Sequence, residues 1–170
     1  MSKAFTRESD DAPDLPLPSR PAALLPPGAK NYLTPGGALR LRAELEQLVT
    51  HERPRVASLT DDSDAKRQLQ LINQRITQLQ YALQTAAITG PTSVSDGVVH
   101  FGATVTVRDQ RGEESRYRIV GVDEIDLDRD WVSWLSPLAR SLLNARVGDR
   151  VRLKLPAGEE ELEVLSVSYE

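Results

Sequence analysis

The first apolar stripe in this chain has helical spacing and follows Thr34-Pro35. Its four clearest members are three or four positions apart: Ala38, Leu41, Leu45 and Leu48. Threonine can cap the free amide groups of a helix start, and proline is tolerated at the first helical position. The pattern therefore predicts a helix that begins here and continues more weakly through Val56 and Leu59. We expect Pro54 to bend it, because proline removes one backbone hydrogen bond.

The second stripe is more regular, with successive spacings of 3, 4, 3, 4 and 3. Its members are Leu69, Ile72, Ile76, Leu79, Leu83 and Ala86. This alternation is typical of a heptad seam, and Gly90-Pro91 is expected to end the helix. A short polar turn, "TDDSD", separates the stripes, so residues 31–90 are predicted to form an antiparallel coiled-coil hairpin. Each arm of about 24 residues would be about 36 Å long.

After about residue 91 the period changes to two, which indicates strands. "GATVTVRD" alternates cleanly, and four further strands are expected in "SRYRIVGV", "DWVSWL", "VRLKL" and "EELEVLSVSY". "SPLARSLLNARVGD" predicts one short helix, with Ser136 as its cap and Pro137 at its first position. The fold class is therefore α+β, with a small antiparallel sheet and one helix in residues 91–170.

Composition separates the first 30 residues from the rest. They hold six of the eleven prolines: Pro13, Pro16, Pro18, Pro21, Pro26 and Pro27. Acidic and small residues fill much of the remainder, so residues 1–30 are predicted to be a flexible arm.

Charge and residue types exclude several function classes. The net charge is −4, distributed as 0 over residues 1–33, +1 over 34–90 and −5 over 91–170. No basic face appears at this level, so we expect no autonomous DNA binding and only indirect contact with nucleic acid. Cysteine is absent, and the two histidines lack metal-ligand spacing. No signal peptide or apolar run of about 18 residues is evident, which favours a cytoplasmic protein with no membrane partner.

The three aspartates of the turn, Asp61, Asp62 and Asp64, support two interpretations. They can be a helix cap on a solvated turn, because carboxylates favour helix N-termini. Alternatively, two carboxylates three positions apart can hold Mg²⁺ jointly with another molecule, since Mg²⁺ often takes only one or two carboxylates from a protein. Such a metal would not be stably bound by this chain alone.

No active site of its own is apparent, so the chain is predicted not to be an enzyme. Ser136 and Ser141 have no positioned histidine and are interpreted as capping and packing residues. Trp131 and Trp134, three positions apart on one expected strand, should point to opposite faces. Either one of them is exposed as a partner anchor or both belong to the core.

Several stretches together resemble the Gre transcript-cleavage factors, GreA and GreB. They are "YLTPGGALRLRAELEQL", "ERP", "VHFGATVTV", "YRIVGVDEI" and "SPLARSLLNARVGD". The resemblance implies a coiled coil joined to an FKBP-like domain that binds RNA polymerase, with the coiled coil inserted into the secondary channel. It also implies that the acidic tip helps the polymerase to hold a second Mg²⁺, so this chain would need no cofactor of its own. Asp61 and Asp64 correspond to the family's tip Asp and Glu.

The sequence also departs from the Gre pattern. Asp64 is one methylene shorter than the family's Glu, and each arm is about seven residues shorter, which withdraws the tip by about 10 Å. A short-coiled relative, the Rnk group (regulator of nucleoside diphosphate kinase), resembles "LKLPAGEEELEVLSVSY". We therefore expect modulation of initiation or elongation, and competition with other channel binders, ahead of stimulated transcript cleavage through the tip carboxylates, which stays open as a second effect.

The resemblance also places polymerase docking on the segment around the predicted short helix. Its expected contact residues are Trp134, Leu135, Ser136, Pro137, Leu138, Arg140 and Leu142. Leu135 stands where the family has an Asp tied to polymerase binding. Two alternatives remain, an FKBP-like prolyl isomerase and a passive coiled-coil interaction module. The sequence does not indicate an oligomeric state.

Overall fold

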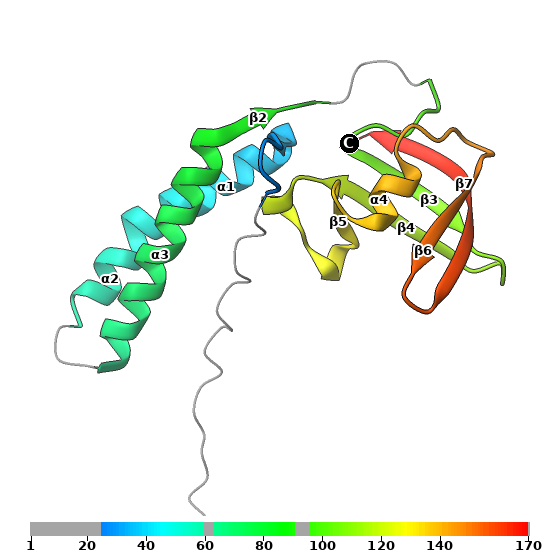
Figure 1. Cartoon of the computed structure of the whole chain (residues 1–170). Helices are drawn as coiled ribbons and strands as arrows, with labels where there is room; N and C mark the ends of the chain where they lie inside the picture. Colours follow the sequence, from blue (N-terminus) through cyan, green and yellow to red (C-terminus); the bar gives the residue numbers. More distant parts are fainter. Residues whose placement is uncertain (1–24, 60–62, 91–95, 170) are drawn as a thin grey trace, which may run out of the picture.

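The computed structural model describes residues 25–59, 63–90 and 96–169. Figure 1 shows a helical hairpin that projects away from a body built around a sheet. The hairpin holds the helices α1, α2 and α3, and the body holds α4 and the strands β3 to β7. None of the helices in the described ranges has the length and apolar character that a bilayer crossing requires.

The first arm of the hairpin is three helical pieces in sequence. Helix α1 spans Pro35–Gln47, a π-helical segment η1 spans Leu48–Glu52, and α2 spans Arg53–Ala57. Thr34 caps α1 as predicted, since its side chain accepts a hydrogen bond from the Gly37 amide. The irregularity expected at Pro54 takes the form of η1, a widened turn that ends at Glu52, two residues before the proline. A wider turn accommodates a residue without an amide proton.

The second arm is one helix, α3 (Ser63–Thr85), which packs along α1, η1 and α2. Near the body, Ala38 and Leu41 of the first stripe and Leu79 of the second form a buried cluster with Leu33, which precedes α1. Arg75 of α3 and Glu44 of α1 add a two-pronged ion pair, with N–O distances of 2.7 and 2.9 Å. The stripe of the first arm fails at Leu59, whose side chain is 52% exposed.

Helix α3 ends earlier than the sequence indicated. It stops at Thr85, and strand β2 (Ala86–Ile88) follows, paired in parallel with β1 (Asn31–Leu33). Ala86 is therefore a strand residue and not the last member of the helical stripe. The amide of Thr89 also donates to the carbonyl of Leu33 at 2.9 Å. This pairing supplies the backbone partners that β1 needs, and the β-branched Ile88 and Thr89 favour an extended chain.

The body is a five-stranded sheet with the order β5-β4-β3-β7-β6. The strands are β3 (Ala103–Arg108), β4 (Glu114–Val120), β5 (Trp131–Ser133), β6 (Arg150–Leu155) and β7 (Gly158–Tyr169). The prediction of a fully antiparallel sheet is wrong at one edge, where β5 runs parallel to β4. Two short 3₁₀ turns, η2 (Val122–Glu124) and η3 (Leu127–Arg129), carry the chain back so that it re-enters in the same direction.

One face of this sheet carries the apolar core, which α4 (Pro137–Leu142) covers. Ser136 caps α4 as predicted, accepting from the Ala139 amide at 3.1 Å. Val105, Val107 and Ile119 are almost completely buried on that face. The prediction that both tryptophans share one strand is wrong, because β5 ends at Ser133 and Trp134 packs against the core beyond it.

Candidate functional site

The helical hairpin is fastened to the body by one buried carboxylate, that of Glu124 in η2. It accepts hydrogen bonds from the amide of Thr34 at 2.8 Å and of Gly121 at 3.0 Å, and a short one from the Thr34 hydroxyl. A guanidinium nitrogen of Arg40 lies 3.3 Å away. The carboxylate therefore sits at the N-terminus of α1, where a negative charge is favoured by the exposed amides and the helix dipole. We call this arrangement the joint.

The glycines at the start of α1 make room for the joint. A Cβ atom at Gly37 would overlap the carboxylate of Glu124, whereas one at Gly36 would meet only the end of the Arg40 side chain, at 3.4 Å. Gly121 is equally constrained, since a Cβ there would overlap the carbonyl oxygen of Tyr32. Two consecutive glycines in a helix cost stability relative to alanine, and the close approach of Glu124 explains the second one.

A second set of polar contacts extends the joint toward α3. The Asn31 side-chain amide donates to the Ala82 carbonyl, the Thr85 hydroxyl and a carboxylate oxygen of Asp123, each at 3.2 Å. Tyr32 adds aromatic contacts, with ring centroids 5.7 Å from Phe101 and 5.3 Å from Trp134. Strand β1 therefore contacts both α3 and the body, and it helps to fix the direction in which the hairpin projects.

Asp123 gives this region a pH dependence. Burial raises the pKa of its carboxyl, and the proximity of Glu124 acts in the same direction, while the Asn31 hydrogen bond and Arg75 oppose the shift. A raised carboxyl pKa means that stability falls as pH increases from about 3.8 through the folded-state value.

We expect Asp123→Asn to remove this loss and to stabilise the protein at pH 7, measured by urea unfolding at several pH values. The matched control is Asp128→Asn, an exposed site; a variant less stable than wild type at pH 7 would contradict the prediction.

The predicted tip lies at the far end of the hairpin. Asp61 and Asp62 are outside the described residues. Asp64 is exposed in the first turn of α3, where a carboxylate suits the helix N-terminus. The described ranges hold no group of three or more His, Cys, Asp or Glu side chains placed to bind a metal. Oxygen ligands suit Mg²⁺, and Asp64 alone provides too few of them to hold one.

The predicted docking segment falls partly on the surface. Pro137 and Arg140 are exposed, and Leu135 and Ser136 are half-buried. Trp134 and Leu138 are partly buried and pack against the body core. Leu142 is a correction, because it is fully buried in that core and cannot contact a partner. A helix of this length shows one face outward, and Leu142 lies on the other.

Sequence reasoning missed the joint altogether. Glu124 lies within "YRIVGVDEI", where no local pattern marks it for a role, and no pattern marks Asn31 for chemistry or packing. The available signal was "TPGG", because two glycines in the first turn of a helix indicate that something approaches the backbone closely. A single sequence does not reveal that the approaching group comes from 84 to 90 positions away.

Comparisons with known proteins bear on the same two parts of the molecule. Residues 94–169 match the family model described as "Transcription elongation factor, GreA/GreB, C-term". The chain is 41% identical over 154 residues to transcription elongation factor GreB of Neisseria meningitidis serogroup B, covering 82% of this chain and 94% of that protein. It is 38% identical over 156 residues to transcription elongation factor GreA of Alkalilimnicola ehrlichii, covering 83% and 99%.

Among solved structures, the chain is similar to GreA factor homolog 1 (Gfh1) of Thermus thermophilus. The identity is 28% and the TM-score is 0.39, with 82% of this chain and 99% of that chain covered.

Proposed function

Because this chain belongs to the GreA/GreB family of transcription elongation factors, we propose that it binds RNA polymerase and modulates transcription through its helical hairpin. The family resemblance read from the sequence is confirmed by these matches. The matches give no support to the alternative of a prolyl isomerase. The chain would act as an accessory factor in the cytoplasm and would leave any chemistry to the polymerase.

One observation carries the proposal: the likeness to GreB covers the hairpin as well as the body. The matched 82% of the 170 residues is about 139 residues, whereas residues 94–169 account for 76. More than 60 matched residues must therefore precede residue 94, and most of the hairpin is among them. A factor that acted through the body alone would not need the helical hairpin.

We propose the same three parts that the sequence suggested. Residues 31–90 are a coiled-coil finger, residues 91–170 an FKBP-like body, and residues 1–30 an arm. The joint supports this division, because a finger that enters a channel of another protein needs a fixed direction. Hydrogen bonds from Thr34 to Glu124 and from Asn31 to Asp123 supply that fixing, because they join the two parts.

A shortened finger is supported by the lengths of the alignments. The GreB alignment has 154 positions but includes only about 139 residues of this chain. At about 15 positions the relative therefore has a residue where this chain has a gap. The GreA alignment leaves a similar number. This matches the loss of about seven residues from each arm that the sequence indicated. A tip withdrawn by about 10 Å would not reach a metal whose ligands must be placed within a few tenths of an ångström.

For the body we propose docking through the exposed part of the α4 region. Pro137 and Arg140 offer an apolar and a cationic contact, and the partly exposed Leu135 and Leu138 lie beside them. Leu142 is left out because it belongs to the core. The tip aspartates, Asp61, Asp62 and Asp64, would then present negative charge to the interior of the polymerase, where any Mg²⁺ is held mainly by the polymerase itself.

A pull-down with core RNA polymerase tests the binding. We expect the full chain to be retained, and Arg140→Ala to weaken retention about tenfold if the cation makes a charge-assisted contact. Arg152→Ala, at an exposed arginine of β6, is the matched control and should bind as wild type does. Absence of wild-type retention would favour a passive coiled-coil module.

Transcription assays on stalled complexes test the role of the tip. We expect wild type to alter elongation or initiation without strong transcript cleavage, and the combined Asp61→Ala and Asp64→Ala variant to lose that effect while still binding polymerase. Glu159→Gln, which removes an exposed charge in the β6–β7 hairpin, should behave as wild type. Strong wild-type cleavage that the tip variant abolishes would show that the finger does reach the metal.

A further inference from the structure

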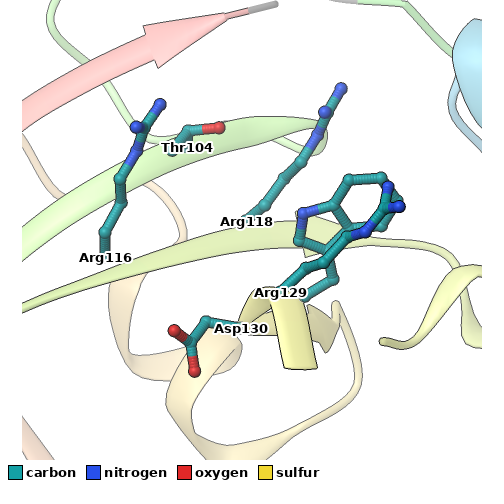
Figure 2. Close-up of a pocket in the computed structure, with 6 residues that line it drawn as sticks. Thr104, Arg116, Arg118, Arg129 and Asp130 are labelled. Atoms are coloured by element: carbon teal, nitrogen blue, oxygen red, sulfur yellow. The ribbon is translucent and has the colours of Figure 1, made fainter. Parts of the chain in front are cut away.

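Trp131 of β5 lies where the finger meets the body, and three arginines of the chain surround its ring. The guanidinium carbons of Arg40, Arg118 and Arg129 are 4.4, 5.0 and 5.3 Å from the ring centroid. Figure 2 shows Arg118 rising from β4 and Arg129 from η3 on the same side of the body. Arg40 comes from α1 in the finger, so this ring joins the two parts of the molecule.

The body holds the backbone of Trp131 from two sides. The Trp131 amide donates to the carbonyl of Asp126 at 2.8 Å, and the Asp126 amide donates back to the Trp131 carbonyl at 3.3 Å. On the other side β5 pairs in parallel with β4, where Arg118 lies opposite Trp131. Because the body alone fixes this backbone, the half-buried ring offers a cation a surface that does not depend on the finger.

Arg40 is the finger's side of this contact. Its guanidinium also lies 3.3 Å from the buried carboxylate of Glu124. Burial lowers the pKa of Arg40, and the Glu124 carboxylate opposes that shift. Two groups of the body therefore favour the cation at this position, the carboxylate by its charge and the Trp131 ring by a cation–π contact.

The position of Arg40 along α1 suits it to hold an angle. Thr34 bonds to Glu124 at the very start of the helix, whereas Arg40 lies six positions later, about 9 Å further along the helix axis. Bonds at one end of a rigid body fix its position better than its direction. A second contact displaced along the body resists rotation about the first, and the stack of Arg40 on Trp131 is such a contact.

We propose that Trp131 is a positioning residue, which holds the direction of the finger by presenting its ring to Arg40. The inference rests on the proposed function, in which the finger enters a channel of RNA polymerase. Planar guanidinium groups stack on aromatic faces, whereas the ammonium group of lysine is a point charge. The identity of both side chains therefore matters, and not the charge alone.

Pulsed electron paramagnetic resonance between two spin labels measures the direction of the finger in the free chain. The chain has no cysteine, so labels can be attached at Gln70→Cys on α3 and Glu159→Cys on β7, both exposed positions. We expect Trp131→Leu and Arg40→Lys each to broaden the distance distribution about twofold, because both remove the stack while Arg40→Lys keeps the charge beside Glu124. Trp131→Phe keeps an aromatic face and should restore most of the narrow distribution.

Two matched controls separate the stack from a general change of charge or aromatic content. Arg42→Lys alters an exposed arginine two positions further along α1, and Tyr81→Leu alters an aromatic side chain of α3 that is 67% exposed. Both should leave the distribution unchanged. Arg40→Lys does not touch the core of the body, so it tests the stack even where Trp131→Leu perturbs the body. The proposal fails if Arg40→Lys and Trp131→Leu leave the distribution as narrow as in wild type, or if Arg42→Lys broadens it equally.

Transcription assays connect the stack with the proposed function. Trp131→Leu should weaken the effect of the chain on transcription several-fold while its retention by polymerase stays that of wild type, because the body still docks. An undiminished effect from a variant with a broadened distribution would overturn the role of Trp131 in positioning. The label distances are measured without polymerase, so this inference and the proposed function can fail separately.

Discussion

Gly37→Ala is expected to lower the free energy of unfolding by about 3 kcal/mol, although alanine is the better helix former. The new Cβ atom would overlap the Glu124 carboxylate, which is held in place by Thr34 and Gly121. Either the carboxylate moves and leaves buried donors unpaired, or α1 shifts away from the body. Both responses cost free energy, and urea unfolding measures the sum.

Gly36→Ala provides the matched control one position earlier in the same helical turn. Its new Cβ would meet only the end of the Arg40 side chain, at 3.4 Å, and that end can rotate away. We therefore expect this variant to be unchanged or stabilised by about 0.5 kcal/mol, as helix propensity predicts. If the two variants lost stability equally, the close packing of Glu124 on Gly37 would be contradicted.

Glu124→Ala turns the comparison into a double-mutant cycle. This variant alone should be destabilised by about 3 kcal/mol, because it leaves the Thr34 and Gly121 amides without their acceptor. In that background Gly37→Ala has nothing to overlap and should cost little further. The expected coupling free energy between the two positions is therefore nearly equal to the destabilisation caused by Gly37→Ala alone. This is well above the roughly 0.5 kcal/mol within which independent substitutions are additive.

The joint also connects stability with the proposed function. Variants that loosen it should leave the fold of the body intact, because the body has its own core around Val105, Ile119 and Leu142. They should weaken the effect of the finger on transcription more than they weaken binding to polymerase. A fixed direction matters for a projecting finger, since a small change of angle at the base becomes a large displacement at the tip.

Local patterns predicted most of the elements, and the reason differs between them. The 3- and 4-residue spacing gave the helices, and the caps at Thr34 and Ser136 gave two of the starts. Period-two alternation gave β3. The end of α3 was misjudged because Ala86 fits a helical stripe as well as a strand, and what decides between them is its pairing with β1. That pairing joins residues 55 positions apart and leaves no local mark.

Residues defined by distant contacts could not be predicted. Leu142 lies in the segment that was expected to dock, but its side chain is buried in the core. Only the position of α4 on the sheet shows which of these roles Leu142 has. The arginines around Trp131 are a similar case, because Arg40, Arg118 and Arg129 lie in different segments of the sequence and come together only in the fold. The net charge of a chain region sums over residues that the fold places on different surfaces. A local group of positive side chains therefore cannot be recognised from that sum.

Leu79→Ala is expected to be the other strongly destabilising change, with a loss of about 2–5 kcal/mol. Leu79 is 1% exposed and packs in the cluster with Leu33, Ala38 and Leu41, where α3 meets α1 and β1. Removing most of its side chain leaves a cavity among residues that the joint holds in place, so the site cannot collapse easily.

Leu71→Ala is the matched control on the same helix, because Leu71 is 39% exposed and should lose less than about 1 kcal/mol. Urea unfolding measures both variants, and a loss for Leu79→Ala no larger than that for Leu71→Ala would contradict this packing. Because the cluster includes Leu33 of β1, the Leu79 variant should also loosen the strand that carries Asn31 and Tyr32, and hydrogen exchange at the β1 amides should rise with it.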